Sequence, residues 1–180
     1  MSTPTKNVAV LGSLDAGRAD LCKAMAKLSA AKYGGNKTEF SPETQNSVDV
    51  KGPKHNYTLH HKESGGGPHK RYDLAVVLIP ATRGAKPSDE QALLAASAAG
   101  CERFVAFMSK CDMLDGDTES LDRAEESVRD ILDSSLRHRA KIEIIRGHTG
   151  FSFNCDDVKT QDSLVKLFEE LERITVRTRN

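Results

Sequence analysis

The sequence lacks an excess of charge of either sign, a long apolar run and closely paired cysteines. Its 26 Lys and Arg residues balance 26 Asp and Glu residues, so electrostatic attraction to DNA or to an anionic membrane is not expected. No apolar run is long enough to span a bilayer, and residues 1–6 lack the apolar core of a signal peptide. The four cysteines form no C-x-x-C pair. Because this pattern is typical of reduced thiols, we expect a cytoplasmic protein that binds neither membranes nor DNA.

What the sequence does contain is a regular alternation of strand-like and helix-like segments. Its 180 residues have the composition of a soluble protein, and we take residues 1–180 as a single domain. The alternation favours an α/β fold with a mainly parallel sheet. The expected strands are residues 7–11, 47–51, 56–61, 73–79, 104–108 and 141–145, of which the second and third could form an antiparallel hairpin. The expected helices are residues 18–32, 88–100 with a capping box at 88–91, and segments around 121–132 and 164–174.

The first expected strand runs into a turn framed by glycines. Gly12 and Gly17 have the G-x-x-x-x-G spacing of a phosphate-binding P-loop, and a helix follows them. In such a loop, backbone N–H groups and the helix N-terminus hold the phosphates. Arg18 stands where the motif has Lys, and Ala19 stands where it has Ser or Thr. Arg18 keeps the positive charge on a bulky planar fork, whereas Ala19 offers no hydroxyl to Mg²⁺.

Asp20 adds a carboxylate to the first turn of this expected helix. A negative side chain stabilises a helix start, but it repels a phosphate bound there. For charges roughly 5 Å apart at an effective dielectric of about 20, the repulsion is on the order of 3 kcal/mol. We therefore expect Asp20, paired with Arg18, to satisfy the helix N-terminus in place of a phosphate.

Taken in order, these segments resemble the G domain of translation elongation factor Tu, a translational GTPase. The resemblance covers nearly the whole chain and is carried by residues 7–11, 26–28, 31–35, 72–79, 81–84, 107–113 and 144–147. It implies a P-loop GTPase-like three-layer domain with a six-stranded, mainly parallel sheet and helices on both faces. The family's second and third domains, which help to hold aminoacyl-tRNA, have no sequence here, so we do not expect tRNA delivery.

The resemblance implies that the motifs which read guanine are partly kept. Lys110 and Asp112 match the Lys and Asp of the family's Asn-Lys-x-Asp motif, in which the Lys stem packs on the base and the Asp accepts two hydrogen bonds from it. Ser109 replaces the Asn and presents no amide. His148 and Thr149 stand where the family has Ser-Ala-Leu, and we expect His148 to crowd or replace the contact to the guanine oxygen.

The motif that senses the γ-phosphate is lost. His61 begins the slot in which the family has Asp-x-x-Gly, so the carboxylate that supports Mg²⁺ is missing, and no His follows Gly65 to position the attacking water. The connection over residues 62–72 is shorter than the family's, so we expect the switch II helix to be absent or reduced to a turn. Phosphoryl transfer depends on positioning and on metal-assisted charge stabilisation, and efficient hydrolysis is therefore not expected.

These departures favour a degenerate G domain, a pseudo-GTPase that acts as a binding or regulatory module for an unidentified protein partner. We expect weak or no binding of GTP or GDP, no Mg²⁺ and no catalytic residue. Two alternatives stay open: a GTP-binding protein with slow hydrolysis, and a metal or thiol site at the histidines of residues 55–69 or at Cys111. The candidate nucleotide-site residues are Asp15, Gly17, Arg18, Ala19, Asp20, Lys110, Asp112, His148 and Thr149.

Overall fold

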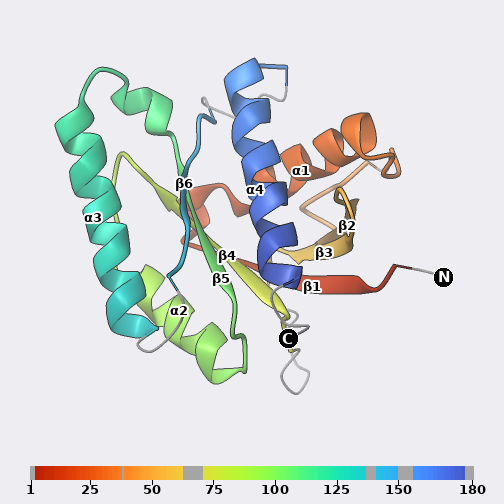
Figure 1. Cartoon of the computed structure of the whole chain (residues 1–180), viewed down its shortest axis with the longest axis horizontal. Coiled ribbons are helices and arrows are strands. Elements are labelled where there is room, and N and C mark those ends of the chain that lie inside the picture. The colour runs from red at the N-terminus through yellow and green to blue at the C-terminus, as the bar shows by residue number, and fades with distance from the viewer. Residues whose placement is uncertain (1–2, 38, 63–70, 137–140, 150–155, 177–180) are drawn as a thin grey trace.

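A computed structural model describes residues 3–37, 39–62, 71–136, 141–149 and 156–176. In this part of the chain, six strands form one sheet, flanked by four α-helices and two short 3-10 helices (Figure 1). The strands are β1 (Thr5–Leu11), β2 (Ser47–Lys51), β3 (Asn56–His60), β4 (Leu74–Pro80), β5 (Phe104–Ser109) and β6 (Ile144–Arg146). The helices are α1 (Arg18–Lys32), α2 (Pro87–Ala98), α3 (Thr118–Ser135), α4 (Val158–Val176), η1 (Leu14–Ala16) and η2 (Cys111–Leu114).

β1 lies inside the sheet, whose strand order is β2-β3-β1-β4-β5-β6. It pairs in parallel with β3 on one side and with β4 on the other, and β5 and β6 continue the parallel ladder. β2 runs antiparallel to β3, as the hairpin interpretation predicts. The chain adds β2 and β3 on one side of β1 and then β4 to β6 on the other. The strand order therefore reverses at β1, and a crevice opens at the carboxyl end of a strand in this position.

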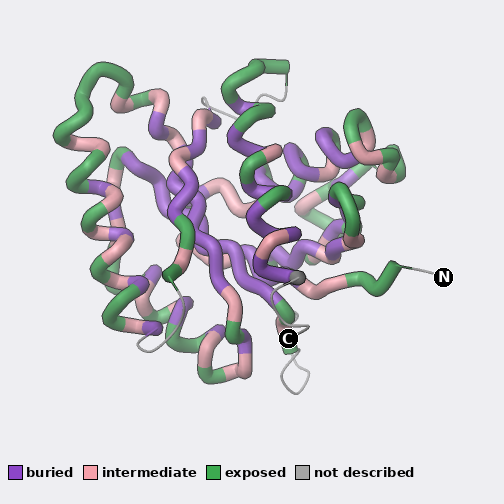
Figure 2. Tube along the Cα trace, viewed as in Figure 1, coloured by how far each residue is buried: buried purple, intermediate pink, exposed green. Residues whose placement is uncertain are grey.

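Two helices cover each face of the sheet. Val8 and Val10 of β1 pack in the core beneath α1 and α4, whereas Ala9 packs in the core beneath α2 and α3. All seven residues of β4 are buried, which explains why this strand reads as an unbroken apolar run. Figure 2 shows the central strands almost wholly buried and the outer sides of the helices exposed. Among the described helices, none is both long and apolar enough to cross a bilayer.

The mainly parallel α/β architecture is confirmed, and the ends of the expected strands shift by up to three residues. The expected capping box at Ser88 is wrong, because α2 begins at Pro87 with Lys86 as its N-cap. The Asp89 carboxylate accepts a hydrogen bond of 2.9 Å from the Lys86 backbone N–H, and it also binds Arg83. The capping contact therefore forms one residue earlier than expected, with Pro87 as the first helical residue. The expected loss of the switch II helix concerns residues 62–72, of which residues 63–70 lie outside the described residues.

One buried carboxylate ties α4 to the β2–β3 hairpin. Glu172 accepts hydrogen bonds of 3.0 Å from the backbone N–H groups of Lys54 and His55, and its other oxygen lies 2.5 Å from His55 Nδ1. Burial raises the pKa of Glu172, but the hydrogen bonds outweigh this effect and leave the pKa below the ordinary value of 4.5. The folded protein therefore binds a proton at Glu172 more weakly than the unfolded chain does.

The substitution Glu172→Gln should lower the free energy of unfolding at pH 7 by about 1–3 kcal/mol, because a charged acceptor is lost. Since the folded-state pKa is lowered, this stabilisation is fully present above the unfolded value near 4.5 and disappears as the pH falls through the folded value. Urea unfolding of both proteins at pH 7 and pH 3 measures the effect. A difference between wild type and variant that stays constant down to pH 3 would contradict this role for Glu172.

Candidate functional site

The candidate residues lie in loops that leave the same edge of the sheet. Residues 12–17, here called the β1 loop, follow β1, and Arg83 follows β4. Residues 109–112 and 147–149, here called the β5–β6 loops, contain the end of β5 and the turn after β6. Because β1, β4, β5 and β6 are parallel, their carboxyl ends share one edge. The β1 loop stands where the strand order reverses, which is the position at which open α/β sheets bind ligands.

Two glycines shape the β1 loop as the sequence predicts. Gly12 has φ 144° and Gly17 has φ 86°, values that side-chain-bearing residues rarely adopt. A Cβ atom on Gly12 would also lie 2.6 Å from the carbonyl oxygen of Leu78 in β4. α1 begins directly after the loop at Arg18, with Gly17 as its N-cap. The backbone therefore combines a glycine-framed turn with a helix N-terminus.

The expected cap on α1 by Asp20 is not formed. In the described structure, no side chain accepts a hydrogen bond from the first turn of this helix. Asp20 is exposed, and the ion pairs of the described residues do not include one with Arg18. Arg18 and Ala19 are half-buried. The negative charge of Asp20 thus stands beside the helix N-terminus without occupying its N–H groups.

Arg83, which is not among the residues selected from the sequence, contacts the β1 loop through its side chain. Its Nη2 donates to Ser13 Oγ at 2.9 Å, and its Nη1 donates to the buried carboxylate of Asp89 at 2.8 Å. Its Nε lies 3.8 Å from Asp15 Oδ2, and the Ser13 hydroxyl donates to the same Asp15 carboxylate. The side chain of Arg83 is only 10% exposed. Its charge is therefore balanced by two carboxylates of this chain.

The same contacts act on the ionisation of Asp15. The hydrogen bond from Ser13 lowers the pKa of this carboxyl most strongly; slight burial opposes the shift, and the positive charge of Arg83 adds to it. Asp15 therefore keeps its negative charge at neutral pH. Asp15 within the β1 loop and exposed Asp20 in the first turn of α1 thus place two carboxylates at this loop.

The β5–β6 loops are joined to each other by hydrogen bonds that backbone N–H groups donate. The Lys110 N–H donates to Thr149 Oγ1 at 2.9 Å, and the Thr149 N–H donates to Asp112 Oδ1 at 3.0 Å. The Cys111 N–H donates to the Gly147 carbonyl oxygen at 3.1 Å. Thr149 is 1% exposed, so these bonds lie away from solvent. An oxygen of the candidate base-reading carboxylate is thus occupied by the amide of the opposite candidate loop.

Two polar atoms beside these loops are buried without a hydrogen-bond partner in the part of the chain that the structure describes. They are Ser109 Oγ and His148 Nδ1. Ser109 is fully buried and offers one hydroxyl where an Asn would offer both a donor and an acceptor. The backbone N–H of His148 donates to Ser163 Oγ of α4 at 2.9 Å, which fixes the backbone of the turn.

His61 holds the connection between α1 and β2 against the end of β3. Its Nε2 donates to the Gln45 carbonyl oxygen at 2.8 Å, and its backbone N–H donates to the Asn46 carbonyl oxygen at 3.1 Å. The ring of Phe40 meets the His61 ring edge-on, with centroids 5.3 Å apart. Lys62 Nζ donates to the Pro42 carbonyl oxygen at 2.6 Å. These contacts hold residues 40–46 without any ligand.

The alternative metal and thiol sites gain no support from this geometry. The described residues contain no group of three His, Cys, Asp or Glu side chains placed to hold a metal ion. Burial raises the pKa of the Cys111 thiol to about 11, so little reactive thiolate is present near neutral pH. His69 lies outside the described residues. The other clustered histidines have separate partners, which are Glu172 for His55, Asn7 for His60 and Gln45 for His61.

The substitution His61→Ala should release residues 40–46 locally. One lost hydrogen bond is worth about 1 kcal/mol, which corresponds to a roughly fivefold faster amide exchange in this segment. Hydrogen–deuterium exchange read by mass spectrometry measures the change. His60→Ala is the matched control, because His60 is also buried but contacts Asn7 instead. Equal acceleration of residues 40–46 in both variants would contradict the specific role of His61.

No protein-family model matches this chain.

Proposed function

We propose that this protein is a degenerate elongation factor Tu-like G domain, a pseudo-GTPase that acts as a binding or regulatory module. It binds GTP or GDP weakly or not at all and does not hydrolyse GTP efficiently. The observation that carries the proposal is the 3.0 Å hydrogen bond from the Thr149 N–H to Asp112 Oδ1. Asp112 matches the carboxylate with which the resembling family contacts guanine, and Thr149 belongs to the loop that matches the family's second base contact; here the two residues bind each other.

The fold supports the G-domain part of the proposal. The strand order β2-β3-β1-β4-β5-β6, with only β2 antiparallel in the described sheet, is compatible with a P-loop GTPase-like domain. The glycine-framed β1 loop lies where the strand order reverses and precedes a helix. The β5–β6 loops lie at the same edge of the sheet as the β1 loop.

The side chains around the β1 loop support weak phosphate binding. Ala19 has no hydroxyl for Mg²⁺, and Asp15 and Asp20 place two negative charges near the α1 N-terminus. Arg83 would favour a phosphate, but its guanidinium is already paired with Asp89 and lies 3.8 Å from Asp15. A bound phosphate has to compete with carboxylates that the fold keeps in place.

The contacts of His61 support the absence of efficient hydrolysis. Phosphoryl transfer relies on metal ions and on groups that position the nucleophile, and His61 stands where the family has its Mg²⁺-supporting Asp. This histidine donates its Nε2 hydrogen to the Gln45 carbonyl oxygen and so ties residues 40–46 to β3. A segment held by the protein itself has little to gain from the γ-phosphate of a nucleotide.

A GTP-binding protein with slow hydrolysis is the second candidate. It is favoured by one observation: in the described residues, the first-turn N–H groups of α1 have no side-chain cap, so the helix N-terminus can accept an anion. Arg18 opens that helix and supplies a positive charge. The two candidates differ in affinity, in Mg²⁺ dependence and in discrimination between bases.

Titration with fluorescent GTP, GDP and ATP, with and without Mg²⁺, separates these candidates. A pseudo-GTPase should give dissociation constants weaker than about 10 μM, unchanged by Mg²⁺, and GTP and ATP should agree within about threefold. The similarity between bases follows from the Asp112–Thr149 hydrogen bond. Sub-micromolar binding that requires Mg²⁺ and prefers GTP would overturn the proposal and establish the second candidate.

The substitution Asp20→Thr should raise the affinity for inorganic triphosphate. The unscreened repulsion of about 3 kcal/mol corresponds to roughly a hundredfold, and exposure of Asp20 to solvent reduces this to about tenfold. Isothermal titration measures it. Asp130→Thr is the matched control, because Asp130 is also an exposed aspartate on a helix but lies on α3. If the two variants bind triphosphate equally, Asp20 does not oppose anion binding.

A further inference from the structure

β2 is the edge strand of the sheet, and its pairing with β3 leaves the backbone N–H and C=O groups of every second residue pointing away from β3. Backbone hydrogen bonds flank the hairpin at both ends. The His61 N–H donates to the Asn46 carbonyl oxygen at the open end, and the Gly52 N–H donates to the His55 carbonyl oxygen at the turn. The register between them pairs Val48 with Leu59 and Val50 with Tyr57. In an antiparallel ladder the directly bonded pairs alternate, so the N–H and C=O groups of residues 47, 49 and 51 point away from β3.

One of these three outward residues is already paired within the chain. The Lys51 N–H donates to Ser29 Oγ at 2.7 Å, and the Ser29 hydroxyl donates to the Lys51 carbonyl oxygen at 2.9 Å. Helix α1 thereby closes one end of the edge. For Ser47 and Asp49, the described residues form no corresponding bond to the outward N–H or C=O groups. Within the described part of the chain, two successive outward positions with four backbone groups in all are therefore open.

A cavity of about 670 Å³ follows this open edge. β2 lines it along its whole length, and the connection between α1 and β2 lines it through Gly34, Gly35, Phe40 and Gln45. That wall is fixed by the protein itself. The Gly35 N–H donates to the Ser29 carbonyl oxygen at 3.0 Å, and the Gln45 carbonyl accepts from His61. The groove is therefore formed before any ligand arrives.

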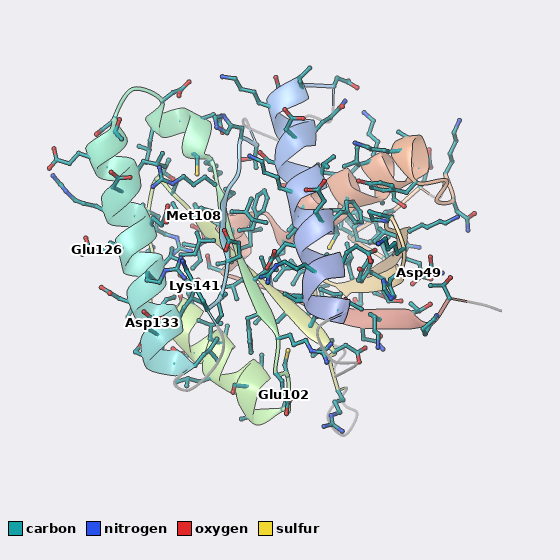
Figure 3. All side chains as sticks on the ribbon, in the orientation of Figure 1. Asp49, Glu102, Met108, Glu126, Asp133 and Lys141 are labelled. Carbon is teal, nitrogen blue, oxygen red and sulfur yellow. The ribbon has the colours of Figure 1, made fainter. Side chains whose placement is uncertain are left out.

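Among the described lining residues Asp49 and Lys51 are charged, and Lys51 is the one whose backbone groups Ser29 already occupies. The Asp49 side chain is exposed, and its Oδ1 accepts a hydrogen bond of 2.6 Å from Thr58 Oγ1 on the neighbouring strand, which restrains the carboxylate. In Figure 3, Asp49 lies at the opposite side of the molecule from Glu126 and Asp133 of α3. A strand added beside β2 would carry a side chain directly opposite this carboxylate, where a basic residue is favoured.

We propose that the β2 edge and its groove bind an extended peptide of a partner protein, which adds to the sheet as a seventh strand and places a Lys or Arg opposite Asp49. Backbone pairing supplies the affinity and the pocket beside alternate side chains supplies the selectivity, as in other cases of strand addition. The inference rests on the proposed role as a binding module and names its partner class.

The structure disfavours a second copy of this chain as the occupant. Antiparallel pairing of two β2 strands through their open positions would set Asp49 opposite Ser47 of the other copy and diagonal to its Asp49, so the two carboxylates would lie near each other and neither would gain a basic partner. A register that spreads over the whole strand would need the Lys51 backbone groups, which Ser29 occupies. A peptide with a basic residue meets neither obstacle.

A displayed library of random twelve-residue peptides, selected on the wild-type protein, supplies the probe. Each enriched peptide is synthesised and titrated against wild type, Asp49→Pro and Asp49→Asn. Proline removes the outward N–H of residue 49 and puts its ring where an added strand would pair. It spares the β2–β3 ladder, to which this N–H does not contribute. Asparagine keeps the backbone and removes the charge. Ser47→Pro is the second blocking variant if Asp49→Pro does not keep the wild-type amide spectrum.

Enriched peptides should contain Lys or Arg, bind Asp49→Pro at least about tenfold more weakly than wild type, and lose a smaller part of their affinity with Asp49→Asn. Binding should also slow hydrogen exchange of the amides of residues 47 and 49. A selection without enriched binders, peptides equally tight on the proline variants, or wild-type dimerisation that Asp49→Pro abolishes would each overturn the proposal. Since no nucleotide enters this experiment, its failure is distinct from failure of the proposed pseudo-GTPase.

Discussion

Strand β1 is hydrogen-bonded to β3 on one side and to β4 on the other, and every candidate loop takes its position from that arrangement. Parallel pairing requires crossovers, and the crossovers bring the loops after β1, β4, β5 and β6 to one edge of the sheet. The side chains of β1 are buried on both faces, so the strand has no alternative register that would keep its core contacts. The β1 loop is consequently held where an open α/β sheet receives its ligands.

At that edge, the polar groups of the protein bind one another. Asp112 accepts from Thr149, Arg83 is paired with Asp89, and His61 donates to the Gln45 carbonyl oxygen. A buried polar group left without a partner costs about 1–3 kcal/mol, so each of these contacts stabilises the empty form. A nucleotide would have to break some of them and repay the loss. This is the physical basis of the proposal that the domain is a binding module and not a nucleotide switch.

Much of the fold could be predicted from the sequence because it depends on periodicity and glycine spacing. The apolar run at β4 and the 3.6-residue pattern of α3 each identify an element from nearby residues alone. The capping box at Ser88 was wrong because α2 begins one residue earlier, at Pro87, so that Asp89 stands at the third helical position and accepts from the Lys86 N–H. The cap by Asp20 was wrong because its side chain faces solvent.

The candidate site was harder to predict because its decisive contacts join residues far apart in the chain. Asp112 and Thr149 were both selected from the sequence, but nothing local indicates that they bind each other across 37 positions. Arg83 was passed over although it lies inside a segment that carries the resemblance. Its role depends on Ser13, which is 70 positions away. The open edge of β2 likewise follows from the pairing register and not from the composition of the strand.

The backbone amide of Thr149 tests the central claim most directly. Its proton and nitrogen resonances report the hydrogen bond to Asp112 and can be followed by NMR while GTP and Mg²⁺ are added to the full chain. If Asp112 Oδ1 keeps its hydrogen bond from the Thr149 N–H, the Thr149 resonance stays in place at millimolar GTP. A saturable, Mg²⁺-dependent shift of this resonance with GTP and not with ATP would mean that the pair opens to read guanine, and it would contradict the pseudo-GTPase proposal.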